Sequence, residues 1–376
     1  MKAIALYIHI PFCKQKCFYC DFPSYASKES LMDEYVESLI IEIKEETKNK
    51  CFKSIFIGGG TPSYLTEELL EKLLKEVNKI EKTNDYEWSI ECNPGTLEDE
   101  KLRIMKKNGV NRISFGLQAV QNQFLNKIGR IHTFDEFKIN FNKAREIGFN
   151  NINVDLMFGL PNQNVANWIE SLETIGELGP EHISAYSLII EEGTAFYSMY
   201  DKGLLKLPSE DEEREMYSIT KETLSNLGYH QYEISNYSKG LKECEHNKVY
   251  WRCEEYIGVG SSSSSFYNNK RYKNSDDVEE YINKINSNES TKEEIYDNTT
   301  EDNMEEFMFM GLRLVEGIKK EEFKERFNKD IYSIYGDVID KNKLMGLLKD
   351  EENRLFLTEK GIEVSNSVMA EFILDK

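Results

Sequence analysis

The chain of 376 residues is long enough for two or three structural units that bury an apolar core without disulfide support. Its 47 basic and 67 acidic residues give a net charge of −20, which disfavours a nucleic acid as the main partner. Seven cysteines are too few for the disulfide framework of a small secreted domain. No stretch approaches the ~20 apolar residues of a membrane-spanning helix, so we expect a protein that does not itself span a membrane. The lack of a disulfide framework favours a reducing compartment, most simply the cytoplasm.

The first half of the chain alternates short β-rich runs with helical stripes of apolar residues. The β-rich runs are Ile4–Ile10, Ser54–Gly58, Glu87–Cys92, Arg112–Leu117, Asn151–Met157 and His182–Ile190. Helical stripes lie between them, and Gly148 is the expected C-cap of the stripe that begins at Phe134. Six β-then-α repeats fall short of the eight in a complete barrel. They predict an α/β fold with a parallel, open (β/α)6 barrel over residues 1–209, whose site lies at the carboxyl ends of the strands.

The regular alternation stops after Ser209, and a helix over Glu210–Leu227 begins a second unit, residues 210–290. The serine run Ser261–Ser265 in this unit predicts a flexible loop. A polar stretch over Asn283–Asn298 predicts a linker to a third unit, residues 291–376.

The third unit combines short helical patterns with a strand-like segment near its end. The helical patterns cover Met304–Leu314, Lys320–Phe327 and Asp337–Lys349, the strand-like segment is Arg354–Thr358, and a last helix follows. This order predicts a smaller, α-rich, winged-helix-like domain. Its many acidic residues favour a packing or protein-contact role over DNA binding.

Three cysteines spaced C-x3-C-x2-C directly follow the first predicted strand: Cys13, Cys17 and Cys20. Structural zinc sites usually supply four ligands, often as two CxxC pairs. Three thiolates on one loop instead match a cubane iron–sulfur cluster that keeps one iron open for a bidentate small molecule. Lys14 and Lys16 in the same loop would stabilise the thiolate charge.

A glycine-rich turn, Gly58-Gly59-Gly60-Thr61-Pro62, follows the second predicted strand. Glycines let backbone N–H groups approach a ligand closely, although such a turn alone is weak evidence. The turn lacks the lysine of a P-loop and the spacing of a dinucleotide fingerprint. Because it lies at the same strand end as the cysteine loop, we expect both to belong to one site.

The cysteine motif, with the aromatic Tyr19 before its last cysteine, and the glycine-rich turn together resemble the radical S-adenosylmethionine (SAM) superfamily. The resemblance implies a [4Fe-4S] cluster on Cys13, Cys17 and Cys20, whose open iron chelates the amino and carboxylate groups of SAM. It also implies one-electron cleavage of SAM to a 5′-deoxyadenosyl radical. The cofactor would supply the chemistry and the protein would position it.

Five segments narrow the resemblance to the oxygen-independent coproporphyrinogen III oxidase group: Tyr7–Cys13, Gly58–Pro62, Glu91–Pro94, Ser114–Gln118 and Asn153–Pro161. Carried over by position, the resemblance implies that SAM is lined by Tyr7, Tyr19, Gly59, Gly60, Thr61, Glu91, Gln118, Arg130 and Asp155. Glu91 and Asp155 lie near predicted strand ends, where a carboxylate can accept from ribose hydroxyls or an amino group. Helix capping or solvation is their alternative role.

Two departures from the oxidase are typical of the HemW-type haem chaperone branch of this group. The oxidase has a further cysteine where this chain has Phe22, and an N-terminal extension for which the position of Cys13 leaves no room. The segment His246–Trp251 fits the HNxxYW motif of the branch, in which this histidine is implicated in haem binding. Imidazole is a normal axial ligand of haem iron. Many members also have a second histidine near Ser264, which this chain lacks.

The resemblance implies a haem chaperone that carries a [4Fe-4S] cluster and SAM, binds haem and delivers it to acceptor proteins, such as a membrane-bound respiratory protein. One alternative is a radical SAM oxidoreductase acting on coproporphyrinogen III or another tetrapyrrole. Another is an iron–sulfur module with a vestigial SAM site, against which the intact cysteine set argues. Phe22 and the missing extension favour the chaperone over the oxidoreductase. The sequence leaves catalytic residues and the oligomeric state open.

Two other roles compete for the residues around His246. Cys244, His246 and Cys253 permit a zinc site with Glu243 or Glu254 as fourth ligand, although their spacing fits no common zinc pattern. His246 can equally be a structural histidine that is paired with an amide or water. Cys51 and Cys92 are expected to be core thiols.

Overall fold

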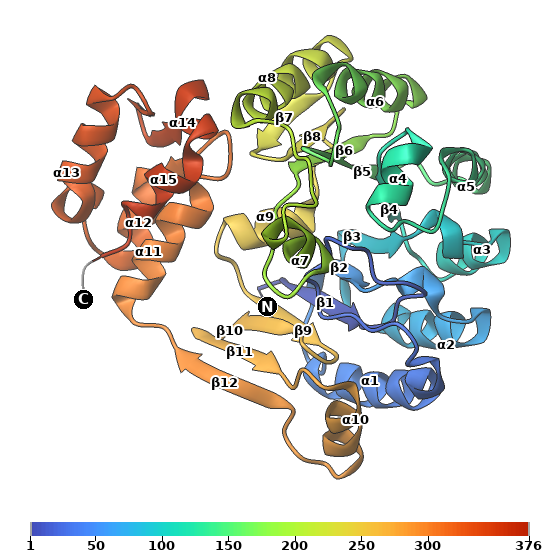
Figure 1. Ribbon diagram of the computed structural model, residues 1–376. Helices are drawn as coiled ribbons and strands as arrows, with labels where there is room; N and C mark the ends of the chain where they lie inside the picture. The colour runs from blue at the N-terminus through green and yellow to red at the C-terminus, as the bar shows by residue number, and fades with distance from the viewer. Residues whose placement is uncertain (1, 375–376) are drawn as a thin grey trace.

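The computed structural model describes residues 2–374 as a large curved sheet, helices on its outer side, and a smaller C-terminal domain across its open side (Figure 1). The strands of the large sheet are β1 (Ile4–Ile10), β2 (Phe52–Gly59), β3 (Lys82–Cys92), β4 (Arg112–Gln118), β5 (Ile152–Phe158), β6 (His182–Ser187), β7 (His230–Glu233), β8 (Asn236–Ser238), β9 (Tyr256–Val259), β10 (Ser264–Tyr267), β11 (Lys270–Asn274) and β12 (Lys292–Asp297). The helices that accompany it are α1 (Met32–Glu46), α2 (Glu67–Asn78), α3 (Asp99–Lys107), α4 (Asn122–Lys127), α5 (Phe134–Ile147), α6 (Val165–Leu178), α7 (Ala195–Asp201), α8 (Glu210–Asn226), α9 (Glu245–Trp251) and α10 (Val278–Asn286).

Strands β1 to β6 lie side by side in chain order and pair in parallel, which confirms the predicted open barrel. Their residues are buried almost continuously, as in β1, because helices cover the outer face and side chains fill the inner one. The six predicted runs are all strands. The last one is shorter than predicted, since β6 ends at Ser187.

The outer helices are capped as their sequences indicate. Helix α5 begins with a capping box between Thr133 and Glu136, and Gly148 ends it in the left-handed region with φ of 98°. The predicted C-cap is therefore confirmed. Helix α3 was not predicted, because its nine residues bury only a short apolar group around Leu102 and Met105, too few to establish a helical period.

The serine run is the clearest error of the sequence prediction. Ser261, Ser263 and Ser265 are buried, and β10 already begins at Ser264. The hydroxyl of Ser263 donates to the carbonyl of Gly260 at 2.7 Å, and the hydroxyl of Ser265 accepts from the N–H of Gly258 at 2.9 Å. Small side chains that bond to nearby backbone let the chain turn tightly between β9 and β10, so the segment is ordered rather than flexible.

The predicted linker is also wrong, because residues 283–298 contain the end of α10 and all of β12. Strands β9 to β12 extend the sheet beyond β1, with β9 parallel to β1 and the next three strands antiparallel. Four of the six residues of β12 are charged, which is typical of an edge strand. Because the strand has no apolar run, the sequence pattern did not indicate it.

The C-terminal domain has its own apolar core and a small sheet of order β13-β15-β14. Its elements are α11 (Thr300–Gly311), β13 (Ile318–Lys319), α12 (Lys320–Phe327), α13 (Ile331–Leu344), β14 (Leu348–Glu351), β15 (Arg354–Leu357), α14 (Glu359–Glu363) and α15 (Ser365–Ala370). Two helices between β13 and the β14–β15 hairpin form the predicted winged-helix-like arrangement. The helix predicted to reach Lys349 ends at Leu344, because strand β14 of the hairpin begins at Leu348 and contains Lys349.

Several contacts fasten the C-terminal domain to the sheet, among them a backbone pair at β7 and an ion pair at β11. Beside β7, the N–H of Ile234 donates to the carbonyl of Arg313, and the N–H of Val315 donates to the carbonyl of Tyr232. At β11, the Arg271 guanidinium pairs with both carboxylate oxygens of Glu306 at 2.6 Å. The large sheet includes strands of both the first and the second predicted unit, since β9 pairs with β1 and β8 pairs with β6. The predicted division of the chain at residues 209 and 290 therefore stays a prediction. Within residues 2–374, no helix combines the length and apolarity needed to cross a membrane.

Candidate functional site

The carboxyl ends of the parallel strands bring most of the predicted site residues into one pocket. The register places Glu91 of β3 opposite Ser114 of β4, and Asp155 of β5 opposite Gly116. Parallel strands end at the same edge of a sheet, so their last side chains and the following loops converge there. Of the predicted residues, this pocket is lined by Cys13, Cys17, Cys20, Tyr19, Gly59, Gly60, Thr61, Glu91, Gln118, Arg130 and Asp155. We call it the cysteine pocket.

The cysteine loop is held by contacts from distant parts of the chain. The hydroxyl of Thr61 donates to Sγ of Cys13 at 3.4 Å, and Nη1 of Arg130 donates to Sγ of Cys17 at 3.5 Å. Burial raises the pKa of the Cys13 thiol and raises that of Cys20 to about 11. Since the thiolate is the ligand form, a metal that binds here releases protons. Three sulfurs lining one pocket, with donors aimed at two of them, suit a thiolate-bound cluster.

Glycine is required in the turn after β2 because the chain passes close to two neighbours. Gly59 has φ of +108°, and a Cβ there would lie 2.3 Å from the imidazole of His9. A Cβ at Gly60 would lie 2.8 Å from the carbonyl oxygen of Phe12 and 3.1 Å from Sγ of Cys13. The absence of both side chains opens the backbone next to the cysteine loop. The predicted role of this turn therefore has a steric basis.

Two carboxyl groups face each other across the cysteine pocket. Oε2 of Glu91 accepts from the N–H of Gly59 at 3.1 Å, and Oδ1 of Asp155 accepts from the amide of Asn153 at 2.7 Å. Burial, followed by repulsion from Asp155, raises the pKa of Glu91 to about 8. Burial also raises the pKa of Asp155. Arg112 lies near enough to lower the pKa of both acids, and Arg130 lowers that of Asp155, but burial outweighs these charges. Two half-buried acids in one pocket therefore form a site that favours a cationic ligand group.

We expect the raised pKa of Glu91 to appear as a stability difference in the apoprotein. The pKa rises from 4.5 to about 8 on folding, so the folded chain holds an extra proton between these pH values. The free energy of unfolding then falls as pH rises through this window, by up to about 1.4 kcal/mol per pH unit. Glu91→Gln removes this slope. Urea denaturation of both proteins at several pH values measures it.

Glu98→Gln is the matched control, because Glu98 is an exposed glutamate seven residues further along the chain. Its unfolding free energy should follow that of the wild type at every pH. Parallel pH profiles for the wild type and Glu91→Gln would contradict the raised pKa.

Sequence reasoning missed several residues of the cysteine pocket, of which Tyr186 is the most informative. Its hydroxyl donates to Oε1 of Gln118 at 2.8 Å, and burial raises its pKa. Gln118 itself has φ of +76°, where the pairing of β4 with β5 shifts register. Tyr186 lies at the carboxyl end of β6, so the strand-end rule that selected Glu91 and Asp155 could also have selected it. The other missed lining residues include Gln15, Ser24, Asn93, Ser114 and Gly116.

Tyr7 lies outside the cysteine pocket, in a neighbouring hollow that we call the tyrosine pocket. Its lining consists of Tyr7, His9, Phe22, Pro23, Tyr250, Tyr256, Ser262 and Ser264. Phe22 lines both pockets and is 61% exposed. The two pockets are therefore adjacent, with the end of the cysteine loop between them.

His246 lines neither pocket and is only 1% exposed. Its ring stacks on Phe56 with centroids 5.2 Å apart, Nδ1 bonds to the hydroxyl of Ser54 at 3.1 Å, and Nε2 bonds to the hydroxyl of Tyr250 at 2.9 Å. Burial lowers its pKa to about 3, so the ring is neutral. Both nitrogens are thus in use, which deprives the alternative zinc site of its nitrogen ligand. Cys244 in turn directs its thiol to Glu87 at 3.5 Å.

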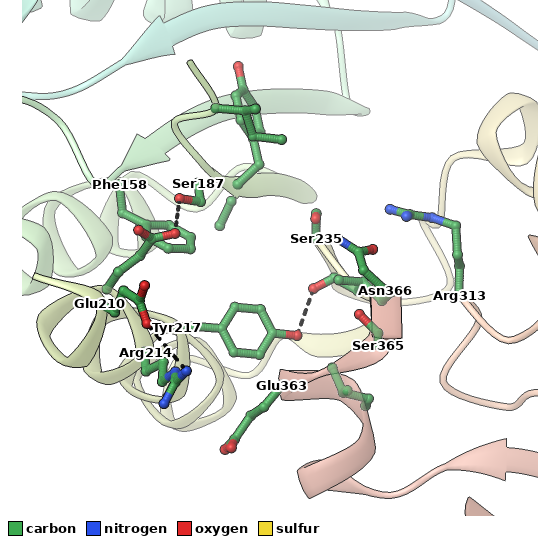
Figure 2. A pocket seen from close by; sticks show the side chains of 16 residues that line it. Phe158, Ser187, Glu210, Arg214, Tyr217, Ser235, Arg313, Glu363, Ser365 and Asn366 are labelled. Carbon is green, nitrogen blue, oxygen red and sulfur yellow. Dashed lines mark hydrogen bonds and ion pairs between the residues drawn. The ribbon is translucent and has the colours of Figure 1, made fainter. Parts of the chain in front are cut away.

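A third pocket, of about 430 Å³, lies between the sheet and the C-terminal domain (Figure 2). Phe158 and Ser187 come from the strand ends, Tyr217 from α8, and Arg313 reaches in from the opposite side. Its two cations are already paired, Arg214 with Glu210 and Arg313 with Glu233, each at 3.6 Å. None of the predicted site residues lines this interdomain pocket.

Comparison with protein families identifies the class to which this fold and site belong. Residues 7–175 match the model described as Radical SAM superfamily, and residues 298–364 match the HemN C-terminal domain. The solved coproporphyrinogen III oxidase (HemN) from Escherichia coli superimposes over 99% of this chain and 90% of its own, with a TM-score of 0.86 and 21% identity. The fold is therefore that of a radical SAM protein with a HemN-type C-terminal domain.

Similar curated proteins place the chain more narrowly. The Heme chaperone HemW of Bacillus subtilis is 40% identical over 372 residues, which cover 98% of each chain. That of Lactococcus lactis is 37% identical over 375 residues, covering 100% of this chain and 98% of its own, and that of Escherichia coli is 40% identical over 69% of each chain. The chain belongs to the HemW family.

Membership of the radical SAM superfamily implies a [4Fe-4S] cluster and SAM. The cysteine pocket fits both groups, because it supplies three thiols, a glycine turn without side chains, and two carboxyl groups. The sequence resemblance led to the same expectation of a [4Fe-4S] cluster and SAM in one site.

Proposed function

We propose that this chain is a haem chaperone, which binds haem and delivers it to acceptor proteins. The observation that carries the proposal is similarity along almost the full length to proteins named Heme chaperone HemW, at 37–40% identity over 98% or more of both chains. Phe22 supports it, because the sequence comparison expects a further cysteine at this position in the oxidase.

Within this proposal the cysteine pocket holds the resident cofactors. Cys13, Cys17 and Cys20 ligate the cluster, and the opened backbone at Gly59 and Gly60 receives the methionine part of SAM. The remaining contacts to SAM in this pocket come from Tyr19, Thr61, Glu91, Gln118, Arg130 and Asp155. Tyr7, the other residue that the sequence assigns to SAM, would contact it from the adjacent tyrosine pocket. When bound, the cluster and SAM supply one-electron chemistry. Arg130 keeps its guanidinium on Cys17 and on the carbonyl of Gly116, which fixes the loop beside the cluster.

The acceptor we propose is a respiratory haem protein, which can be membrane-bound, and the place of action is the cytoplasm. All seven cysteines are free thiols, as expected for a reducing compartment. We also propose three units, a barrel over residues 1–209, its extension with the HNxxYW segment over 210–290, and the C-terminal domain over 291–376.

The test compares haem transfer with tetrapyrrole oxidation in the same preparation. Anaerobically reconstituted protein should bind haem in a titration and pass it to an apo-haem acceptor, measured by the absorption spectrum of the acceptor. Incubated with coproporphyrinogen III, SAM and a reductant, it should form no protoporphyrinogen IX.

The Escherichia coli oxidase HemN, assayed in parallel, is the positive control for the second reaction. Formation of protoporphyrinogen IX by this chain, together with a failure to bind haem, would replace the chaperone by a radical SAM oxidoreductase.

A further inference from the structure

A chain of hydrogen-bonded side chains runs from β7 through β6 to β5 and ends at Asp155 in the cysteine pocket. Its other members are Tyr232, His182 and Asn153, and the register of the parallel pair β5 and β6 sets Asn153 beside His182. Asn153 is 2% exposed and His182 is 0% exposed. Buried polar groups persist in a folded protein only when they have partners, so the contacts of this chain are informative.

The amide of Asn153 is the last link before Asp155. Its Nδ2 lies 2.7 Å from Oδ1 of Asp155 and 2.8 Å from the hydroxyl oxygen of Ser114. Its Oδ1 lies 2.6 Å from Nδ1 of His182 and 3.1 Å from the hydroxyl oxygen of Ser184. The amide therefore uses both of its N–H donors and both lone pairs of its oxygen, which leaves it a single orientation.

The chemistry of the partners gives every bond of the chain the same direction. A carboxylate only accepts, so the NH2 group of Asn153 faces Asp155 and its oxygen faces His182. Burial lowers the pKa of His182, so the ring is neutral, donates from Nδ1 and accepts at Nε2 from the hydroxyl of Tyr232 at 2.8 Å. The phenol oxygen accepts in turn from the N–H of Cys244 at 3.2 Å. Each bond thus polarises the next toward Asp155.

This chain acts on the state and the direction of the Asp155 carboxyl group. Burial raises the pKa of Asp155, and the hydrogen bond from Asn153 comes first among the contacts that lower it. The same bond occupies Oδ1. Oδ2 has a long contact of 3.5 Å to the hydroxyl of Ser114, so it is the oxygen that a ligand in the cysteine pocket can engage.

We propose that Asn153, held by His182 and Ser184, is a positioning residue that presents the Asp155 carboxylate to a cationic or hydroxyl group of SAM. The proposal rests on the SAM site proposed above. Neither Asn153 nor His182 lines the cysteine pocket, so the influence of both on a ligand passes through Asp155. An asparagine that only filled the barrel would affect stability and leave the affinity for SAM unchanged.

Equilibrium dialysis of labelled SAM against the anaerobically reconstituted protein tests the proposal. Asn153→Leu should raise the dissociation constant for SAM at least about tenfold, because leucine donates no hydrogen bond to Asp155. Asp155→Asn should raise it at least as much. The double variant should bind no more weakly than Asp155→Asn alone, because Asn153 acts only through Asp155. Asn140→Leu is the matched control, since this buried asparagine of α5 donates to the carbonyl of Leu97 at 3.0 Å and should keep wild-type affinity.

The iron content and the thermal unfolding midpoint show whether each variant is folded. If Asn153→Leu fails to fold, Asn153→Ser replaces it, because a serine hydroxyl is too short to reach Asp155 and the space it leaves admits water. Wild-type affinity in a folded Asn153 variant, or in Asp155→Asn, would overturn the proposal. A further loss in the double variant relative to Asp155→Asn would overturn it too.

A wild type that binds no SAM would refute the SAM site and the positioning role together. Haem binding by the same preparation is measured separately by titration. Failure of this proposal is therefore distinguishable from failure of the haem chaperone function.

Discussion

Cys17→Ala abolishes the iron–sulfur cluster when the protein is reconstituted anaerobically. We expect about four irons per chain in the wild type and none in the variant, because a cubane held by three thiolates cannot lose one of them. Cys17 also accepts from Nη1 of Arg130, so its removal takes away both a ligand and the anchor of this guanidinium. Iron and sulfide analysis, with the visible absorption of the cluster, measures the loss.

Cys51→Ala is the control for this experiment, because Cys51 is a free thiol that lines neither the cysteine pocket nor the tyrosine pocket. It should keep the iron content of the wild type. Unchanged iron in Cys17→Ala, or equal loss in both variants, would show that the three-cysteine loop does not hold the cluster.

Glu42→Ala loosens the sheet extension formed by β9 to β12. Glu42 of α1 is 3% exposed and accepts from the N–H of Gly260 at 2.7 Å, the hydroxyl of Tyr281 at 2.6 Å, the amide of Asn274 at 2.6 Å and the hydroxyl of Thr291 at 3.4 Å. Alanine leaves these buried donors without an acceptor. We expect the free energy of unfolding to fall by roughly 3 kcal/mol, because each unsatisfied buried group costs about 1–3 kcal/mol.

Urea denaturation followed by circular dichroism measures this change, and hydrogen exchange locates it. Amides of β9 to β11 should lose protection while those of β3 to β5 keep theirs. Glu45→Ala, on the exposed side of the same helix, should change stability by less than about 0.5 kcal/mol. Equal stability of Glu42→Ala and Glu45→Ala would remove Glu42 from its role as the anchor of the extension.

The barrel and most of its site could be predicted because both depend on local patterns. Apolar runs such as Ile4–Ile10 indicate buried parallel strands, and the strand-end rule then places Cys13, Gly59 and Glu91 at one edge. The same reasoning gave wrong predictions for the serine run, expected to be a flexible loop, and for the polar edge strand β12, expected to be part of a linker. Besides the local serine bonds, their order depends on contacts far away in the chain. The N–H of Ser261 donates to the hydroxyl of Tyr35, and Lys292 of β12 pairs with Glu46. Composition does not reveal such contacts.

The surroundings of His246 could not be predicted from the motif alone. The spacing in His246–Trp251 identifies residues that matter together, and one turn of helix explains why His246 and Tyr250 meet. Which of them reaches a pocket depends on β2, since Ser54 bonds to the imidazole and Phe56 stacks on it, while Tyr250 lines the tyrosine pocket. The motif spacing therefore predicts that the two side chains meet, and only the tertiary structure shows that His246 is buried.

The sequence by itself determined the chemistry that this protein can carry: three thiolates on one loop, a turn open to a ligand, and acids at strand ends. Covalent spacing and strand periodicity are local, so they can be read along the chain. Only the tertiary structure decided which groups share a pocket, which are buried and paired, and how far the sheet extends. Burial and hydrogen bonding depend on contacts between segments such as α1 and β9 or α9 and β2, which lie about two hundred residues apart.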